Sequence, residues 1–243
     1  MIENHEIKLV EGYVDAHGVA HRRVVFGRRL TAKDLMRIDS DPQSQSPTQY
    51  TLLIARAAIV AFGDLPMTDG KGKRIAVALP FLLSLDAVDY EDLIAGHDEF
   101  LRLSRGDAIA EIISSSEIAL GFGIERDGVI YDLVKFGRRL TAKDLVEADR
   151  MNLTGVARLV YEMSRQIEKI TSSRHDLSLD AIDMDLLESL DIEDLNFLRG
   201  GLLLWRESFR FRGKSVPGTN GNRDVSADEG TSSVGIRNPE LVN

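Results

Sequence analysis

A ten-residue segment that occurs twice constrains this chain more than any other feature. Residues 26–35 read FGRRLTAKDL, and residues 136–145 repeat these letters without a change, 110 positions later. Ten identical consecutive residues do not recur by chance in a chain of 243 residues. A long internal repeat indicates that one supersecondary unit is built more than once. The sequence therefore predicts two related units rather than one large domain.

The repeat extends on both sides of the two decapeptides. At the offset of 110 the pairs are Gly18 with Gly128, Val24 with Val134, and Tyr50, Leu53, Ala57 and Val60 with Val160, Met163, Ile167 and Ile170. Further on, residues 89–93 (DYEDL) resemble residues 191–195 (DIEDL) at an offset of 102. We assign the difference of eight residues to a loop at residues 67–74 that only the first copy has. A rival register pairs residues 84–89 with residues 178–183 at an offset of 94.

Each copy opens with a pattern that is typical of a β-hairpin. Residues 7–14 and 22–30 flank a turn in the first copy, and residues 118–125 and 129–140 do so in the second. Both segments are rich in β-branched and aromatic residues, and Asp and Gly occupy the turns. Such runs on either side of a turn predict paired antiparallel strands.

Helices are predicted to follow each hairpin. Thr31 and Thr141 have the character of N-caps, with Asp34 and Asp144 three positions later as in a capping box. A longer helix is expected next in each copy, and a closing helix is expected from Asp89 to near Ser104 or from Asp191 to near Phe209. The apolar positions of the longer helices are Tyr50, Leu53, Ile54, Ala57 and Ala61 in copy one, and Val156, Leu159, Val160, Met163, Ile167 and Ile170 in copy two.

The predicted fold class is therefore α+β, with two related units that each consist of a β-hairpin followed by three or four helices. We place the first unit at residues 1–108 and the second at residues 109–212. Residues 213–243 are rich in Gly, Ser, Thr and Asn and contain no aromatic residue. Such a segment buries too little apolar surface to offset its ordering entropy, so we expect a disordered polar tail.

Composition excludes several classes of protein. Thirty basic against 39 acidic residues give a net charge of −9, which argues against non-specific nucleic-acid binding. No cysteine is present, so disulfides, thiolate zinc sites and a cysteine nucleophile are excluded. The longest apolar runs, residues 57–62 and 75–83, are far shorter than the roughly 18 residues that span a bilayer. We expect a cytosolic protein without a membrane anchor.

The repeated basic residues are the sharpest candidates for a binding site. They are Arg28, Arg29 and Lys33 in the first copy, and Arg138, Arg139 and Lys143 in the second. One reading is a contact with an anion or a nucleic acid, and another is a contact with a protein partner. The reading that we favour is a set of solvated charges that pair with Asp34 or Asp144, because no aromatic residues are interleaved with them.

No pattern nominates a catalytic, metal or cofactor site. His17 and His21 lie near Asp15, but the equivalent second-copy positions are Asp127 and Tyr131, so the unit does not need imidazole there. The acidic clusters at residues 86–92 and 180–194 are attributed to helix starts, where the helix dipole favours negative charge. A phosphate-binding loop and a Gly-x-Ser-x-Gly elbow are both missing. We therefore predict neither an enzyme nor a cofactor.

One apolar segment stands out near the end of the second copy. Residues 197–205 form a dense apolar run that ends at Trp205, the only tryptophan of the chain. We expect most of it to lie in the core of the second unit. Part of it is a candidate for a patch that binds a partner or a second copy, because aromatic anchors often dominate binding energy.

The first copy resembles a known family. The hairpin that ends in RRLTAKDL, followed by residues 82–86 (LLSLD), residues 89–93 (DYEDL) and Phe100, is similar to the tail assembly chaperones of Mu-like and P2-like tailed bacteriophages. The resemblance covers residues 5–105 and extends through the repeat to residues 118–211. Members of that family are usually about the size of one copy, so this chain differs in being a tandem duplication.

The resemblance implies a non-enzymatic helper that acts in the host cytoplasm and is absent from the mature virion. Its implied partners are the tape measure protein, whose amphipathic helices it would cover in apolar grooves, and the tail tube protein. A homo-oligomer also stays open, and residues 213–243 are a candidate extension toward tube subunits. Two other classes remain open: a structural or adaptor component of the tail, and a nucleic-acid-binding protein or enzyme that uses the repeated Arg-Arg and Lys positions.

Overall fold

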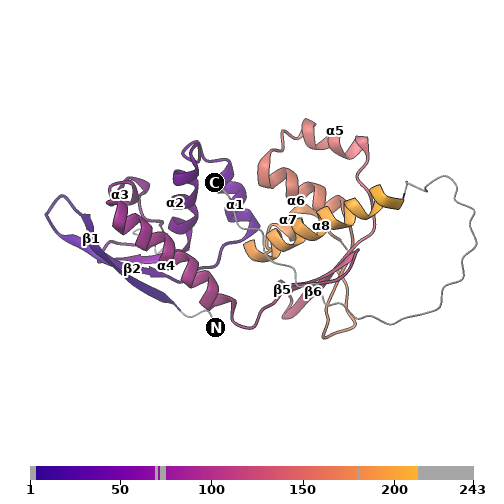
Figure 1. The fold of residues 1–243 in the computed structure, drawn as a ribbon, viewed down its shortest axis with the longest axis horizontal. Helices are drawn as coiled ribbons and strands as arrows, with labels where there is room; N and C mark the ends of the chain where they lie inside the picture. Colours follow the sequence, from indigo (N-terminus) through magenta and orange to yellow (C-terminus); the bar gives the residue numbers. More distant parts are fainter. Residues whose placement is uncertain (1–3, 69–70, 72–74, 180, 213–243) are drawn as a thin grey trace, which may run out of the picture.

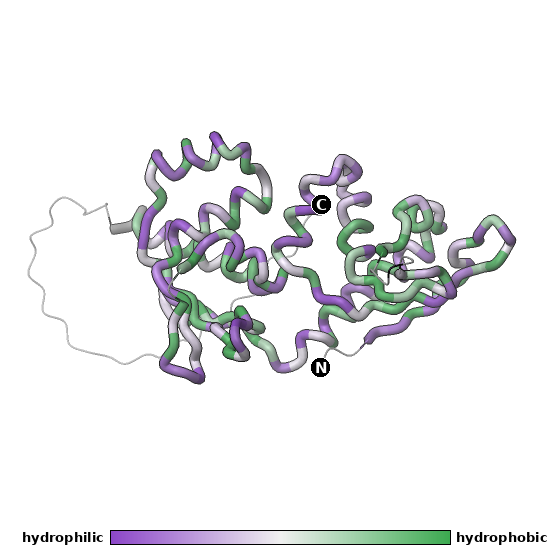
Figure 2. Tube along the Cα trace, turned by 180° about the vertical axis from the view of Figure 1, so that it is seen from behind, coloured by the Kyte–Doolittle hydropathy of each residue, from purple (hydrophilic) through white to green (hydrophobic). Residues whose placement is uncertain are grey.

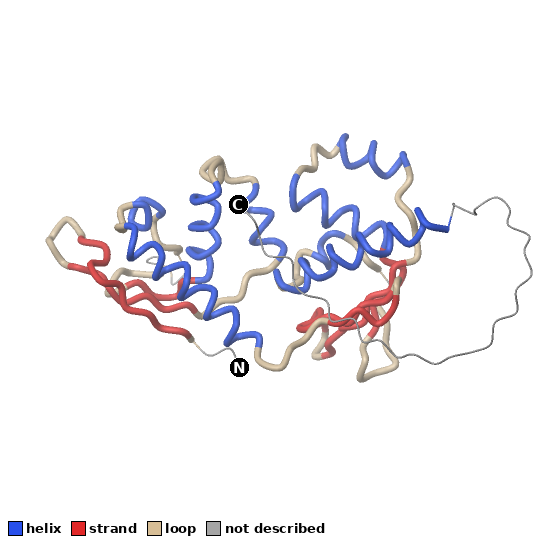
Figure 3. The backbone as a smooth tube through the Cα atoms, in the orientation of Figure 1, coloured by secondary structure: helices blue, strands red, loops and turns tan. Residues whose placement is uncertain are grey.

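The computed structural model describes residues 4–68, 71, 75–179 and 181–212. The predicted disordered tail, residues 213–243, lies outside the described residues. The fold is mixed α+β with two antiparallel sheets, as the sequence predicts (Figure 1). Each sheet is covered on one face by the helices that follow it (Figure 3).

The first unit is built on a sheet with strand order β1-β2-β3. Both predicted hairpins are confirmed, since β1 pairs with β2 in this sheet and β5 pairs with β6 in the second. The long helix α4 crosses β1 and β2. The elements of this unit are β1 (His5–Val14), β2 (Ala20–Phe26), α1 (Ala32–Asp39), α2 (Pro47–Ala58), β3 (Ile59–Phe62), α3 (Leu79–Leu83) and α4 (Ala87–Arg105).

The second unit repeats this order and adds one edge strand, which gives the order β4-β5-β6-β7. The additional strand β4 is short and fully exposed. The elements are β4 (Glu111–Ser114), β5 (Glu117–Arg126), β6 (Val129–Phe136), α5 (Ala142–Arg150), α6 (Gly155–Gln166), β7 (Ile167–Thr171), α7 (Met184–Leu187) and α8 (Ile192–Arg212).

The third strand of each repeated sheet corrects the sequence prediction. We expected helical positions as far as Ala61 and Ile170, but α2 ends at Ala58 and α6 ends at Gln166. The residues that follow turn into β3 and β7, where Phe62 pairs with Val24 and Ile170 pairs with Val134. Periodicity alone cannot separate a short apolar strand from the end of an apolar helix. Pairing with the hairpin decides in favour of the strand.

The register of the second half of the repeat is also corrected. The amides of Gly27 and Gly137 donate to the carbonyls of Ala58 and Gln166, so the longer helices match at an offset of 108 rather than 110. The closing helices match at an offset of 105, because Asp89 and Asp194 occupy the same place under β1 and β5. The alignments of Asp89 with Asp191 and at the offset of 94 are therefore wrong. The first copy has three extra residues in this loop instead of eight.

Each unit buries its own apolar core between sheet and helices. Phe26 and Phe100 lie at the centre of the first core, and their equivalents Phe136 and Trp205 lie in the second. Along the helices, hydrophilic and hydrophobic residues alternate (Figure 2), as expected for amphipathic elements that cover a sheet. No helix within the described ranges is both long enough and apolar enough to cross a bilayer.

Candidate partner-binding site

The first decapeptide (residues 26–35) is docked against the second unit. Its backbone bonds to residues 188–193, which comprise the turn between α7 and α8 and the first two residues of α8. We call these residues the acceptor corner. The amide of Ala32 donates to the carbonyl of Leu190 at 2.8 Å, and the amide of Ile192 donates to the carbonyl of Leu30 at 3.1 Å. The side chains of Ala32 and Leu35 are buried in the core of the second unit. The junction of the two units is therefore a packed interface as well as a chain connection.

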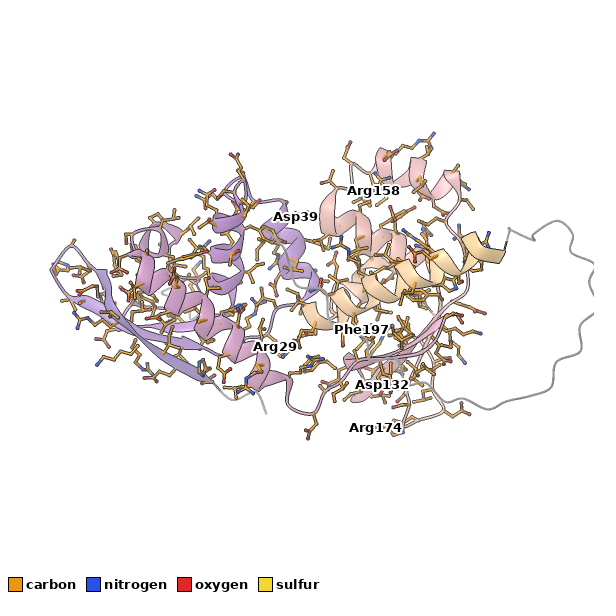
Figure 4. All side chains as sticks on the ribbon, in the orientation of Figure 1. Arg29, Asp39, Asp132, Arg158, Arg174 and Phe197 are labelled. Atoms are coloured by element: carbon orange, nitrogen blue, oxygen red, sulfur yellow. The ribbon has the colours of Figure 1, made fainter. Side chains whose placement is uncertain are left out.

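Arg29 is the polar centre of this junction (Figure 4). Its guanidinium donates to both carboxylate oxygens of Asp191 and to Glu193, each at 2.7 Å, and its side chain is only 8% exposed. The same group lies 3.8 Å from the centre of the Phe122 ring. Burial on its own would lower the pKa of Arg29, but the hydrogen bonds to Asp191 and Glu193 outweigh it and raise that pKa. A fully paired, buried cation thus joins the two units.

Two further contacts tie the first unit to the second. The ammonium of Lys33 lies 2.7 Å from a carboxylate oxygen of Glu188. Asp39, at the end of α1, accepts a hydrogen bond of 3.1 Å from the amide of Val156 at the start of α6. In Figure 4 Asp39 points from the first unit toward the second. Lys33 is therefore engaged within the chain, as Arg29 is.

Arg28 and Arg138 are engaged inside their own units. Each guanidinium donates to both carboxylate oxygens of the aspartate six residues later, Asp34 or Asp144, at 2.7 Å. The same carboxylates accept the amides of Thr31 and Thr141, so both predicted N-caps are confirmed. The pKa of Asp144 is lowered to about 2, first by its hydrogen bonds to Thr141 and then by Arg138. These pairs stabilise the turn that leads into α1 and α5.

The second decapeptide (residues 136–145) has the same sequence as the first but is not covered. Leu35 is 5% exposed, whereas its twin Leu145 is 38% exposed, and Ala142 is exposed where Ala32 is fully buried. Arg139 lies 3.7 Å from the centre of the Phe209 ring. In the part of the chain that the structure describes, neither Arg139 nor Lys143 forms an ion pair. These two are the candidate residues that remain available to a partner.

A cleft of about 480 Å³ opens beside the uncovered decapeptide. Trp205 is 4% exposed and packs on Phe136 and Phe209, so its ring belongs to the core. The residue also contributes to the lining of the cleft. The expectation that this segment is mostly core is therefore confirmed for Trp205. The cleft is lined by Arg139, Leu140, Leu145, Glu162, Gln166, Trp205, Arg206 and Phe209.

A second groove, of about 380 Å³, lies between α5, α6 and α7. Its apolar lining includes Met151, which is 51% exposed, together with Ile182 and Met184. Methionine side chains are flexible and polarisable, and they fit apolar partners of varied shape. The charged residues that line the same groove are Glu147, Arg165, Asp183 and Asp185.

Asp89 and Asp194 are structural residues that the sequence analysis assigned only to helix starts. Each buried carboxylate accepts hydrogen bonds from three consecutive backbone amides, those of Val10, Glu11 and Gly12 or of Gly121, Phe122 and Gly123. Burial raises the pKa of Asp194, and the three amides oppose that change. The capping role does hold for Asp86 and Asp183. The feature of the sequence that could have indicated the amide-binding role of Asp89 and Asp194 is the glycine at the bulge of each long strand, Gly12 or Gly123.

Gly12 and Gly123 allow these bulges. Their φ angles are +72° and +70°, in the left-handed region that favours glycine. The register of β1 with β2 shifts between Lys8 and Tyr13, which turns three amides in a row toward Asp89. This geometry holds each closing helix against its sheet.

The two histidines that the sequence places near Asp15, His17 and His21, are part of the first hairpin. His21 is buried, and its Nε2 lies 3.3 Å from Asp15, while the amide of His17 donates to the same carboxylate. Among the described residues, no group of three or more His, Asp or Glu side chains is placed to hold a metal ion.

Comparison of the chain with protein-family models, with curated proteins and with solved structures finds no match.

Proposed function

We propose that this protein is a tail assembly chaperone of a tailed bacteriophage, which binds the tape measure protein in the host cytoplasm and assists assembly of the tail tube. The proposal rests on the resemblance of residues 5–105 to that family. The observation in the structure that supports it best is the methionine-lined groove between α5, α6 and α7. A groove lined by both apolar and charged side chains suits an amphipathic helix, which presents one apolar stripe between charged residues.

The charge distribution of the decapeptides favours a protein partner over a nucleic acid. Arg28 and Arg138 are neutralised within their units, and Arg29 and Lys33 are neutralised at the junction. The remaining cations, Arg139 and Lys143, are too few for the phosphate neutralisation that drives nucleic-acid binding, and the net charge of −9 opposes it.

Co-expression with the tape measure protein encoded beside this chain tests the proposal. The wild type is expected to keep that partner soluble and to purify with it. The variant Met151→Glu places a charge in the groove and is expected to lose the partner. Leu177→Glu introduces the same change at an exposed apolar residue outside the groove and is expected to keep it. A tape measure protein that stays insoluble with the wild type would refute the proposal.

Mass spectrometry of purified virions separates the chaperone from a structural or adaptor component of the tail. A chaperone is released during assembly, so its peptides are expected to be absent from the virion. Abundant peptides of this chain in the particle would favour the structural component instead.

A further inference from the structure

The two decapeptides have the same sequence but different surroundings, because the first is covered by another part of the chain and the second is open. The first is covered by the acceptor corner, residues 188–193, of the second unit. The second is identical in sequence, its Arg139 has no ion pair in the described residues, and the cleft of about 480 Å³ lies beside it. In the first unit Ile192 of the acceptor corner packs on the core to which Leu30 of the first decapeptide belongs. The open decapeptide therefore lacks an occupant that its twin has.

The first unit contains a segment that is equivalent to the acceptor corner of the second unit but is not covered by a decapeptide. At the offset of 105, residues 83–88 of the first unit correspond to residues 188–193, and we call them the open corner. Leu190 of the acceptor corner is fully buried, whereas its equivalent Leu85 is only partly buried. Leu83 is 49% exposed and Val88 is 57% exposed. The open corner thus presents apolar side chains that nothing in the described chain covers.

Charge complements the apolar surfaces. Asp86 is equivalent to Asp191, the partner of Arg29. The carboxylate of Asp86 is exposed, and among the described residues it accepts only the amide of Asp89. Glu11 is equivalent to Phe122, over which Arg29 lies. The Glu11 side chain is 70% exposed, and its carboxylate lies 3.8 Å from the guanidinium of Arg22. A decapeptide that docked on the open corner as the first one docks on the acceptor corner would place Arg139 between Asp86 and Glu11. An unpaired arginine and two exposed carboxylates complement each other.

The open corner and the open decapeptide lie far apart on the molecule. Figure 1 shows α3, whose last residue Leu83 is the first of the open corner, toward one end of the molecule, and α5, which begins inside the second decapeptide, toward the other. One chain therefore cannot close this contact on itself. A contact between two different surfaces of identical chains is heterologous, and it generates a ring or a helical filament.

We propose that the second decapeptide of one copy docks on the open corner, residues 83–88, of another copy, so that copies of this chain join head to tail. The backbone bonds of the junction would recur, with the amide of Ala142 donating to the carbonyl of Leu85. Glu188 and Glu193 are replaced by Leu83 and Val88. The contact between copies is therefore more apolar and has fewer ion pairs than the junction within the chain.

Two variants block opposite ends of this contact. Ala142→Arg places a long side chain where the twin residue Ala32 is fully buried, yet Ala142 itself is exposed, so the fold is preserved. Val88→Arg blocks the open corner at another exposed residue. Val19→Arg, at an exposed position in the first hairpin turn, is the matched control. Unchanged circular-dichroism melting curves of dilute samples establish that all three variants fold.

Sedimentation velocity of the full chain over a concentration series tests the proposal. The mean mass of the wild type and of Val19→Arg is expected to rise with concentration, and each blocking variant is expected to weaken association at least about ten-fold. An equimolar mixture of Ala142→Arg and Val88→Arg retains one open corner and one open decapeptide. It is expected to form a 1:1 dimer and nothing larger.

Three outcomes would overturn the proposal. The first is a wild type that stays monomeric up to about 1 mM, the limit of weak specific association. The second is an association that neither blocking variant weakens. The third is a mixture of the two blocking variants that forms no dimer. The test needs no tape measure protein, so its result is independent of the proposed function.

Discussion

Replacing Arg29 by methionine tests whether the two units are docked through this side chain. The change leaves Asp191 and Glu193 without their cation, and Asp191 is nearly as buried as Arg29. Removing one partner of a buried ion pair costs about 3–5 kcal/mol, because a charge then stays unpaired in a poorly solvated place. Glu193 is 30% exposed and can regain water, so we expect the lower end, about 3 kcal/mol.

The chain contains its own control for this experiment. Arg139→Met makes the same substitution at the equivalent position of the second decapeptide. Within the described residues, the interaction that this variant removes is the contact of Arg139 with the Phe209 ring. Such a cation–π contact at an exposed site contributes about 0.5–1 kcal/mol. The free energy of unfolding of the two variants should therefore differ by about 2 kcal/mol or more.

Urea unfolding of dilute protein measures this difference. Circular dichroism follows the whole chain, and the fluorescence of Trp205, the only tryptophan, follows the second unit. For a slope of about 2–3 kcal/mol per molar urea, Arg29→Met should lower the midpoint by about 1–1.5 M and Arg139→Met by about 0.5 M or less. Equal shifts for the two variants, or a Trp205 transition that Arg29→Met leaves in place, would refute the docking of the units through Arg29.

Three further predictions concern the closing helices and the caps. Gly201→Ala should destabilise the protein by about 1–3 kcal/mol in the same urea assay, because a Cβ there overlaps Ile118, while Gly200→Ala should stabilise it by up to about 1 kcal/mol, because the position is open. Asp194→Asn should cost about 1–3 kcal/mol, since an amide oxygen cannot accept all three backbone amides in the same way, and hydrogen exchange should reveal faster opening of this bulge. Asp144→Asn should lower the free energy of unfolding by about 1 kcal/mol after allowance for solvent screening. The pKa of Asp144 is lowered from 3.8 to about 2. The difference in stability between the variant and the wild type should therefore be constant above about pH 4 and fade as the pH falls toward 2.

Each of these has a clear contrary result. A stabilising Gly201→Ala would mean that the helix α8 does not approach β5 as closely as described. If hydrogen exchange of the bulge amides were unchanged in Asp194→Asn, the Asp194 carboxylate would not be what stabilises the bulge. A penalty for Asp144→Asn that grows as the pH falls would contradict the lowered pKa.

The parts of the fold that the sequence could predict are those determined by interactions between residues close together in the chain. The hairpins follow from β-branched runs around Asp-Gly turns, and the starts of α1 and α5 follow from Thr31 and Thr141 with their aspartates. These features depend on neighbours within a few residues. The strands β3 and β7 form because they pair with β2 and β6, which are distant in the sequence. The apolar residues of β3 and β7 on their own are equally compatible with a helix.

The register of the closing helices shows why matching letters is not enough. DYEDL and DIEDL align by similarity at an offset of 102, but the structure equates Asp89 with Asp194 through the three amides that each accepts. Phe100 and Trp205 then share a place in the two cores, although their letters differ. The equivalence is set by what each side chain contacts across the sheet, and no window of sequence contains that information.

The state of the candidate site could not be predicted at all from the decapeptide, because the two copies are identical. What distinguishes them is which surface lies next to each, and that follows from the order of the units in the chain. A contact closed within one chain benefits from an effective concentration in the millimolar range, whereas the same contact between copies depends on their concentration. Acceptor residues Glu188 and Glu193 give the junction paired charges, while Leu83 and Val88 give the open corner apolar ones. The junction should therefore form first and stay closed, and the proposed contact between copies should follow only as the protein accumulates.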